Sequence, residues 1–285
     1  MTETSTPLTR GGRNTIRVVI VAAAIVLCLG VVTSLTTVAL GVGRIRAIAD
    51  TQTLPATLRT LHIDAANVPM AIRVVSDDEA TEARVELRFV TTTGTNRHEL
   101  DVTSDAESAR VSVRGAAPGW LRWVRAGEVK VVLPPAAARG LTLNTAQRYG
   151  ALMVDADLDK LVARTDNGAV ILRGAARTTE IHNEHGSIHS RRPIAVRESF
   201  SANTVEGRIS VDFQDPPPPR IEATTGQGEV TIGLGGDGPF LVQASTGAAD
   251  GRTVVRVPRT SDPTEAVSEV TARSEFGSVT IDDRI

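Results

Sequence analysis

The stretch that decides the fold is Leu161–Leu172, LVARTDNGAVIL, which recurs at Ile221–Ile232 as IEATTGQGEVTI. Both copies fit the pattern h-x-A-x-T-x-x-G-x-h-x-h, in which h is apolar and x is any residue. Apolar and polar residues alternate on both sides of the glycine, and this period of two predicts two short β-strands and excludes a helix. A recurring unit of this size indicates a repeat architecture.

Further copies of this pattern fill the second half of the chain. Phe200–Val211 and Val270–Ile281 follow it closely, Leu143–Val154 and Thr179–Ser190 follow it loosely, and a degenerate copy surrounds Gly251. A glycine at each corner takes φ > 0 without steric cost, so we expect all of these glycines to be structural turns. The glycines that align the seven copies are Gly150, Gly168, Gly186, Gly207, Gly228, Gly251 and Gly277.

The repeated glycine fits two structures. Asn167-Gly168 and Asp250-Gly251 are typical of hairpin turns, whereas in a solenoid the glycine would turn a corner between two sides of one coil. The solenoid also explains why small side chains recur at equivalent positions, since stacked coils place them in columns with a thin interior. The predicted columns are Ala163, Ala202, Ala223, Ala244 and Ala272, then Thr165, Asn183, Thr204, Thr225 and Ser274. We therefore expect an all-β, parallel β-solenoid-like domain with repeats over about 143–281.

The N-terminal part predicts a membrane anchor. Residues 18–43 carry no charge and as a helix would span ~39 Å, enough to cross a bilayer. Arg10, Arg13 and Arg17 precede this run, which also suits a cleaved signal peptide, but a secretory apolar region is usually shorter. The expected organisation is a disordered cytoplasmic tail over 1–17, a transmembrane helix over 18–43, a stalk over 44–57 and an extracytoplasmic domain over 58–285. Within that domain, a β-rich capping region precedes the repeats.

Composition excludes several classes of function. The 285 residues include 31 Lys+Arg and 33 Asp+Glu, a net charge of −2, so no basic excess exists to bind nucleic acid. Cys28 is the one cysteine and lies in the apolar run, which excludes a disulfide framework and a cysteine-ligated metal site. No cysteine follows that run, which suits an oxidising exterior. We therefore expect a protein of the cell membrane whose C-terminal domain lies outside the cytoplasm.

Two groups of residues are candidates for binding an ion. His182, His185 and His189 lie within eight residues and could form a metal or pH-sensing site, or a solvated face. Asp155, Asp157 and Asp159 share one face of an alternating run and could hold Ca²⁺, although ~7 Å between them along a strand is wide for one ion.

Three further motifs carry alternative interpretations. Trp120 and Trp123 could contact lipid or a ligand, or only pack within a hairpin. Gly233–Gly238 matches G-x-G-x-x-G, but the following residues read as a strand, so no helix is expected to bind a dinucleotide. No pair of carboxylates and no nucleophile motif stands out, so neither catalytic residues nor a cofactor are expected.

The chain resembles a bacterial family of unknown function named putative adhesins, in which strand repeats often follow one membrane helix. The resemblance rests on Val129–Pro134, on Leu141–Leu143, on the repeats through to Val279–Ile281, and on an initial strand at Leu61–Asp64. It covers residues 58–285. It implies a right-handed β-solenoid-like fold outside the cell membrane, with no catalytic residues to carry over.

Three functions follow as hypotheses: a non-enzymatic envelope module that binds an envelope protein or polysaccharide, a β-helix carbohydrate-active enzyme, and a cytoplasmic membrane-associated scaffold that polymerises. The isolated domain is expected to be monomeric. Its last strand, Ser278–Ile281, is followed by Asp282, Asp283 and Arg284, whose charges would oppose a continued stack.

Overall fold

The structure is a computed structural model that describes residues 45–65, 68–92, 99–114 and 127–283. The expected tail and transmembrane helix, Cys28 and the two tryptophans lie outside these ranges. Among the described residues, no helix is long and apolar enough to cross a membrane. The chain divides into two compact units, and the larger one, Ala47–Val90 with Thr95–Ile285, contains the repeats.

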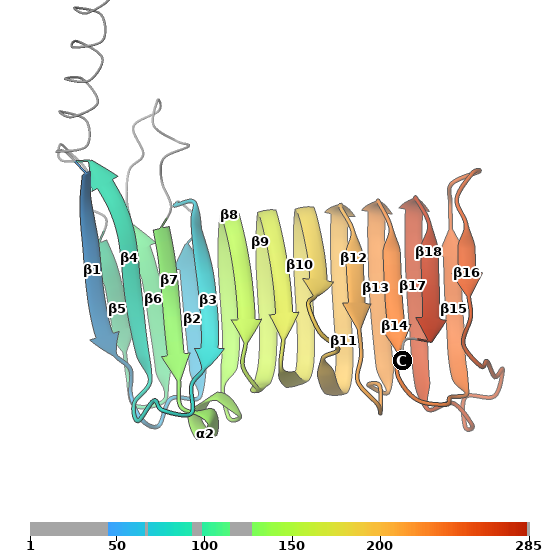
Figure 1. Cartoon of the computed structure of the whole chain (residues 1–285), viewed down its shortest axis with the longest axis horizontal. Helices are drawn as coiled ribbons and strands as arrows, with labels where there is room; N and C mark the ends of the chain where they lie inside the picture. Colours follow the sequence, from blue (N-terminus) through green and yellow to red (C-terminus); the bar gives the residue numbers. More distant parts are fainter. Residues whose placement is uncertain (1–44, 66–67, 93–98, 115–126, 284–285) are drawn as a thin grey trace, which may run out of the picture. The chain divides into compact units, whose positions relative to one another are not determined.

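The described strands form one mixed, mostly parallel sheet of 18 strands in which each repeat has two arms (Figure 1). Three long strands run through their glycine into both arms: β8 (Thr142–Asp155), β9 (Leu158–Arg173) and β10 (Ala175–Ser190). From β10 onward, the first arm contains, in spatial order, β11 (Ala195–Glu206), β13 (Arg220–Gln227), β17 (Ser268–Phe276) and β15 (Phe240–Thr246). The second arm contains, in the same order, β12 (Ile209–Asp212), β14 (Val230–Leu234), β18 (Val279–Asp283) and β16 (Thr253–Val255).

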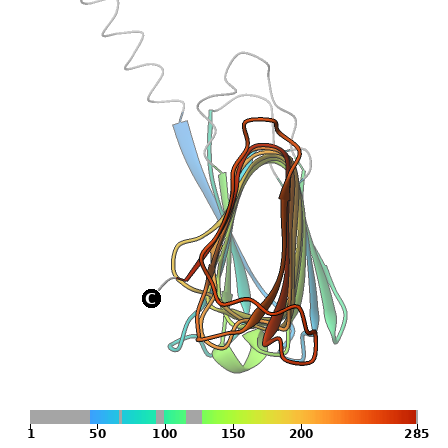
Figure 2. The ribbon, with the colours of Figure 1, turned by 90° about the vertical axis from the view of Figure 1, so that its right-hand side faces the viewer.

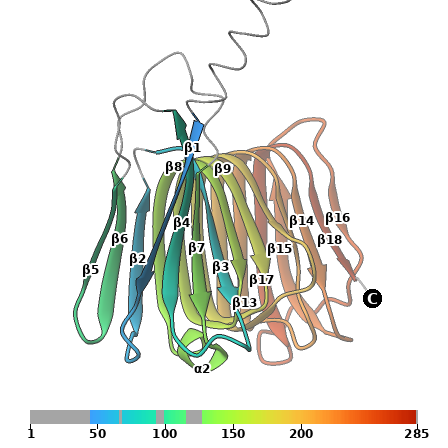
Figure 3. The ribbon, with the colours of Figure 1, turned by 60° about the vertical axis from the view of Figure 1, so that its left-hand side comes forward.

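On the other side of β8, the first arm contains β2 (Thr60–Ala65), β6 (Ser108–Arg114) and β5 (Glu99–Ser104). The second arm contains β3 (Met70–Ser76), β7 (Gly127–Leu133), β4 (Arg84–Thr92) and β1 (Ile45–Thr53). A short helix, α2 (Pro135–Ala138), follows β7. Figure 3 shows these N-terminal strands in front of the stack.

The predicted columns are confirmed by the strand register. Thr165 lies beside Asn183, which is followed by Thr204, Thr225 and Ser274, each on the next strand of the stack. The alanine column is confirmed at Ala202, Ala223, Ala272 and Ala244, and Ile181 lies between Ala202 and Ala163. Gly168 pairs in parallel with Gly150 and Gly186 on neighbouring repeats, so the hairpin interpretation of Asn167-Gly168 is wrong.

The column of glycines is required by close approach of the backbones. Gly228 has φ of +137°, and a Cβ there would lie 2.0 Å from the carbonyl oxygen of Gly207. Gly168 differs, because it is not among the glycines with positive φ, and the prediction of φ > 0 at this residue is wrong. It is nevertheless restricted to glycine, because a Cβ there would lie 1.8 Å from the carbonyl oxygen of Gly150. Gly251 also lacks a positive φ.

Part of the polar column joins neighbouring repeats through these glycines. Thr225 donates its hydroxyl to the Gly207 carbonyl at 3.0 Å, and Ser274 donates to the Gly228 carbonyl at 2.8 Å. The hydroxyls therefore bond to the backbone of the adjacent repeat, and such bonds satisfy carbonyls that burial would otherwise leave unpaired.

The core lies between the two arms and is filled by alternate side chains of both. One column of the first arm holds Leu143, Leu161, Phe200 and Ile221, all at most 2% exposed. Phe200 meets Phe213, which follows β12, in an edge-to-face contact with ring centroids 5.1 Å apart. Both rings are buried in the core.

The spatial order of the last two repeats differs from their order in the chain. β17 pairs with β13 on one side and with β15 on the other, and β18 lies likewise between β14 and β16. Asp282 and Asp283 therefore lie one repeat inside the stack, and the expectation that they close its end is wrong. Val270 and Ala272 of the inner repeat are fully buried, whereas Val242 and Ala244 of the degenerate repeat are only partly buried because that repeat lies at the end of the stack.

The N-terminal region extends the stack as well as covering its first predicted repeat. β2 and β3 both pair in parallel with β8, and β6 and β7 pair in parallel with β2 and β3. The stalk expected over 44–57 is wrong for most of its length, because Ile45–Thr53 forms strand β1 and Leu54 is buried. This segment pairs with β4, and Leu54 supplies apolar surface to the core.

Candidate functional site

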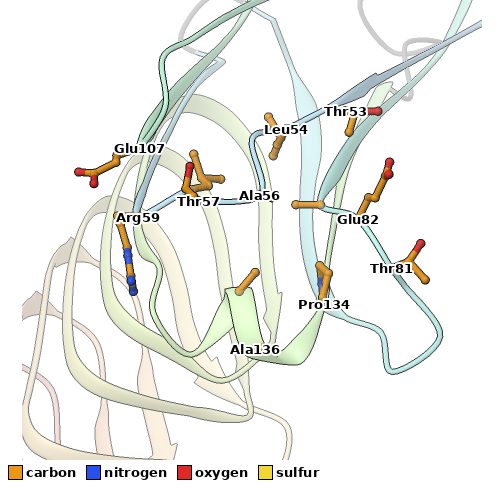
Figure 4. A pocket seen from close by; sticks show the side chains of 13 residues that line it. Thr53, Leu54, Ala56, Thr57, Arg59, Thr81, Glu82, Glu107, Pro134 and Ala136 are labelled. Atoms are coloured by element: carbon orange, nitrogen blue, oxygen red, sulfur yellow. The ribbon is translucent and has the colours of Figure 1, made fainter.

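A concave site with a cavity of about 680 Å³ lies at the base of the N-terminal region (Figure 4). It is built from the loop between β1 and β2, the residues before β4, the turn before β6, and the segment that leads into α2. Its lining residues are Thr53, Leu54, Ala56, Thr57, Leu58, Arg59, Thr81, Glu82, Ala83, Glu107, Pro134, Ala136 and Ala137. We call this site the basal cleft.

Backbone hydrogen bonds fix the walls of the basal cleft. Leu54 donates its N–H to the carbonyl of Ala83 at 2.8 Å, and Arg59 donates its N–H to the carbonyl of Glu107 at 2.7 Å. The Thr57 hydroxyl, in the same loop as Leu54 and Arg59, contacts the carbonyl of Ala106 in the turn before β6. Since these bonds tie three separate segments together, the cleft is a pre-formed feature and does not depend on a ligand to assemble it.

The lining of the basal cleft is apolar at depth and charged at the rim. Leu54, Leu58 and Ala83 are each at most 4% exposed, whereas Arg59 and Glu107 are exposed. The lining contains no histidine, cysteine or lysine, so acid–base chemistry there would depend on glutamates alone. Such a cleft suits an apolar or amphipathic segment that also presents charged groups.

The three candidate histidines are divided between the two arms. His182 and His185 precede Gly186 on the first arm, whereas His189 follows it on the second arm. His182 lies 3.0 Å from Glu180, and His185 lies 3.8 Å from Glu206, so each faces its own carboxylate. Burial, together with the nearby Arg191, lowers the pKa of His189. Among the residues that the structure describes, no group of three histidine, cysteine or acidic side chains is placed to hold a metal ion.

Two of the three candidate aspartates pair with arginines of the next repeat. Asp155 lies 3.2 Å from Arg173, and Asp159 accepts two hydrogen bonds from Arg177 at 2.8 and 3.0 Å. The bonds from Arg177 lower the pKa of Asp159, and Arg177 also pairs with Glu198 of the following repeat at 2.8 Å. These carboxylates therefore join repeats to one another through arginine, and the arrangement leaves no shared oxygen cage for Ca²⁺.

The glycine-rich loop Gly233–Gly238 connects strand β14 to strand β15. The prediction that a strand and not a helix follows this loop is confirmed. The loop therefore lacks the helix N-terminus that binds the phosphates of a dinucleotide.

Sequence reasoning missed the basal cleft. Its loop, from Leu54 to Arg59, falls largely within the predicted stalk, and Pro134 is noted only as part of the segment Val129–Pro134 that carries the family resemblance. The signal was the pair Leu54 and Leu58 beside Pro55, since two leucines are costly to expose on a linker.

Comparison with known proteins gives structural neighbours only. No protein-family model and no curated protein matches the chain. A putative adhesin from Bacteroides fragilis is 12% identical with a TM-score of 0.41, over 83% of this chain and 97% of that one. A putative cell adhesion protein from Clostridium sporogenes is 11% identical with a TM-score of 0.34, over 84% of this chain and all of that one. A putative adhesin from Parabacteroides merdae is 10% identical with a TM-score of 0.35, over 83% and 96%.

Proposed function

We propose that this chain is a non-enzymatic, single-pass membrane protein whose extracytoplasmic β-solenoid is an adhesin-like interaction or structural module of the cell envelope. The observation that carries the proposal is the register of the stack, which repeats outward-facing side chains at equivalent positions from one strand to the next. One such column on the first arm holds Glu180, Ser201, Glu222, Thr271 and Gln243.

In-register parallel pairing over successive repeats supports the solenoid. Each repeat contributes one strand segment to each of the two arms. Figure 2 looks along the stack and shows the repeats lying behind one another. Parallel strands lie ~4.8 Å apart, so every column is a row of side chains at that spacing. A repeated surface of this kind suits an extended partner that is bound through many weak contacts.

Ion pairs between repeats hold the outward face in place. Arg208 lies 2.8 Å from Glu229 of the next repeat, and Arg177 joins the repeats on either side of it. Each exposed pair contributes little to stability, but the pairs restrict long side chains to defined positions. A surface that is already ordered loses less entropy when it binds a partner.

The membrane part of the proposal rests on sequence. Residues 18–43 are uncharged and follow Arg10, Arg13 and Arg17, an arrangement that favours an N-terminus in the cytoplasm. With that orientation the repeats lie outside the membrane, where a binding module can reach envelope protein or polysaccharide.

Alkaline phosphatase fused after Ile285 tests the topology. The proposal expects an active fusion that stays in the membrane fraction. Cells that make the full chain should also adhere to one another or to a surface more than cells that make a chain ending at residue 57. An inactive fusion would instead support the cytoplasmic scaffold.

The enzyme alternative has a separate test. Release of reducing sugars from envelope polysaccharide by the purified chain, with loss of that activity in Glu82→Gln or Glu107→Gln, would favour a carbohydrate-active enzyme. The proposed module predicts no release of sugar from the unsubstituted chain.

A further inference from the structure

The end of the stack formed by β15 and β16 has an open edge. Among the described residues, β15 is hydrogen-bonded in register to β17 alone, and β16 to β18 alone. Both strands lie at the outer end of the stack in Figure 1, and Figure 2 views that end directly.

The backbone of β15 presents unpaired groups on this edge. Gly247, directly after the strand, donates its N–H to Ser274 of β17, whereas Phe240 donates its N–H to Pro258 on the opposite side. Because backbone groups alternate along a strand, the N–H and C=O groups of Val242 and Ala244 face the same way as those of Phe240, away from β17. The segment around Arg259 covers Phe240 only, through one isolated bridge.

This edge also lacks the features that usually protect an exposed strand. Phe240–Thr246 and Thr253–Val255 contain no charged residue and no proline. The apolar interior is open there as well, because Val242, Ala244 and Val255 are partly buried, whereas Val270, Ala272 and Ile281 one repeat further in are fully buried. The opposite end of the stack differs, since its edge strand β5 carries the exposed Asp101.

We propose that this end binds the same end of a second copy of the chain, with β15 pairing antiparallel to β15 of the second copy. The open interior lies between two arms, and a single peptide strand would cover only one of them. An end repeat of another copy has two arms with the same separation as the arms that it would cover. Its strands could therefore pair with both arms, as the strands of adjacent repeats already do. A two-fold axis relates the two copies, so the pairing is antiparallel and self-complementary. Because the two strands carry no charge, like charges of the two copies do not face one another.

The mass of the full chain in detergent micelles, measured by sedimentation over a concentration series, tests the pairing. We expect a dimer for the unsubstituted chain. Gln243→Lys with Ser245→Lys should weaken the dimer at least about tenfold, because like charges then lie opposite one another across the axis. Both side chains are exposed, so the fold should tolerate the change. Glu222→Lys is the matched control, since it lies in the same outward column two repeats further in and should leave the dimer unchanged.

Cross-linking locates the contact and separates it from association through the membrane segment. In a Cys28→Ser background, Gln243→Cys should give a covalent dimer with a short bis-maleimide, whereas Glu222→Cys should not. A monomer at every concentration overturns the proposal, as does a dimer that persists in the double lysine variant or cross-links equally well from position 222.

Discussion

The repeat formed by β17 and β18 and the repeat formed by β15 and β16 lie side by side, yet they fit the stack differently. The first has a neighbour on each side, and Val270 and Ala272 are fully buried. The second has one neighbour, and its equivalent residues Val242 and Ala244 are partly buried. The comparison teaches that the burial of a repeat follows from its number of neighbours in the stack, which its position in the chain does not reveal.

The largest expected difference concerns the glycine corners. Gly228→Val should lower the free energy of unfolding by at least about 3 kcal/mol, because the added Cβ meets the Gly207 carbonyl at 2.0 Å in a left-handed backbone. Gly251→Val in the end repeat should cost less, about 1–2 kcal/mol, because its φ is not left-handed and the added Cβ would lie 2.5 Å from the Gly277 carbonyl oxygen, a milder contact than the one at Gly228. Urea unfolding of residues 45–285 measures both, and equal losses would remove the distinction between the two repeats.

The alanine column gives a second contrast of smaller size. Ala272→Val adds two methyl groups between Ala223 and Ala244 in a filled column, so it should destabilise the domain by about 1–3 kcal/mol. Ala244→Val has free space on its outer side and should change stability by less than about 0.5 kcal/mol. Thermal melts of the two variants provide the measurement, and the prediction is wrong if Ala244→Val is as harmful as Ala272→Val.

The smallest effect belongs to the ion pairs between repeats. Arg177 lowers the pKa of Asp159, so this carboxylate stabilises the fold above its unfolded pKa, and the contribution disappears as pH falls through the lower folded pKa. Asp159→Asn should therefore cost under about 1 kcal/mol at pH 7, and the difference from the unsubstituted domain should shrink as the pH falls below the ordinary carboxyl pKa and vanish below the lower folded pKa. A cost that stays constant down to pH 2 would show that the pair acts through packing rather than charge.

The repeats could be predicted from sequence because each one carries its own pattern. Thr165, Thr204 and Thr225 each lie three residues before their glycine, and this constant spacing predicts both the columns and the parallel pairing. The same pattern could not show that Gly168 lies outside the left-handed region, because a close neighbouring carbonyl and a positive φ both require glycine.

The order of the last repeats and the basal cleft could not be predicted from local patterns. Whether Val270 or Val242 has two neighbours depends on the path of residues 256–267, which allows the chain to return between β13 and β15. The cleft depends on hydrogen bonds between distant segments, such as Leu54 to Ala83 and Arg59 to Glu107. Strand Ile45–Thr53 was missed because its pairing with β4 is also a distant contact.

Disulfide formation tests the central claim, that the last repeat of the chain lies inside the stack and leaves β15 and β16 at its end. Thr224 lies beside Arg273, and Arg273 lies beside Ser245, so Thr224 and Ser245 are two strands, or about 10 Å, apart. In a Cys28→Ser background, Thr224→Cys with Arg273→Cys should oxidise to an intramolecular disulfide. Thr224→Cys with Ser245→Cys should not, because their Cα atoms are too far apart. The opposite result would mean that the repeats follow chain order and would contradict this account.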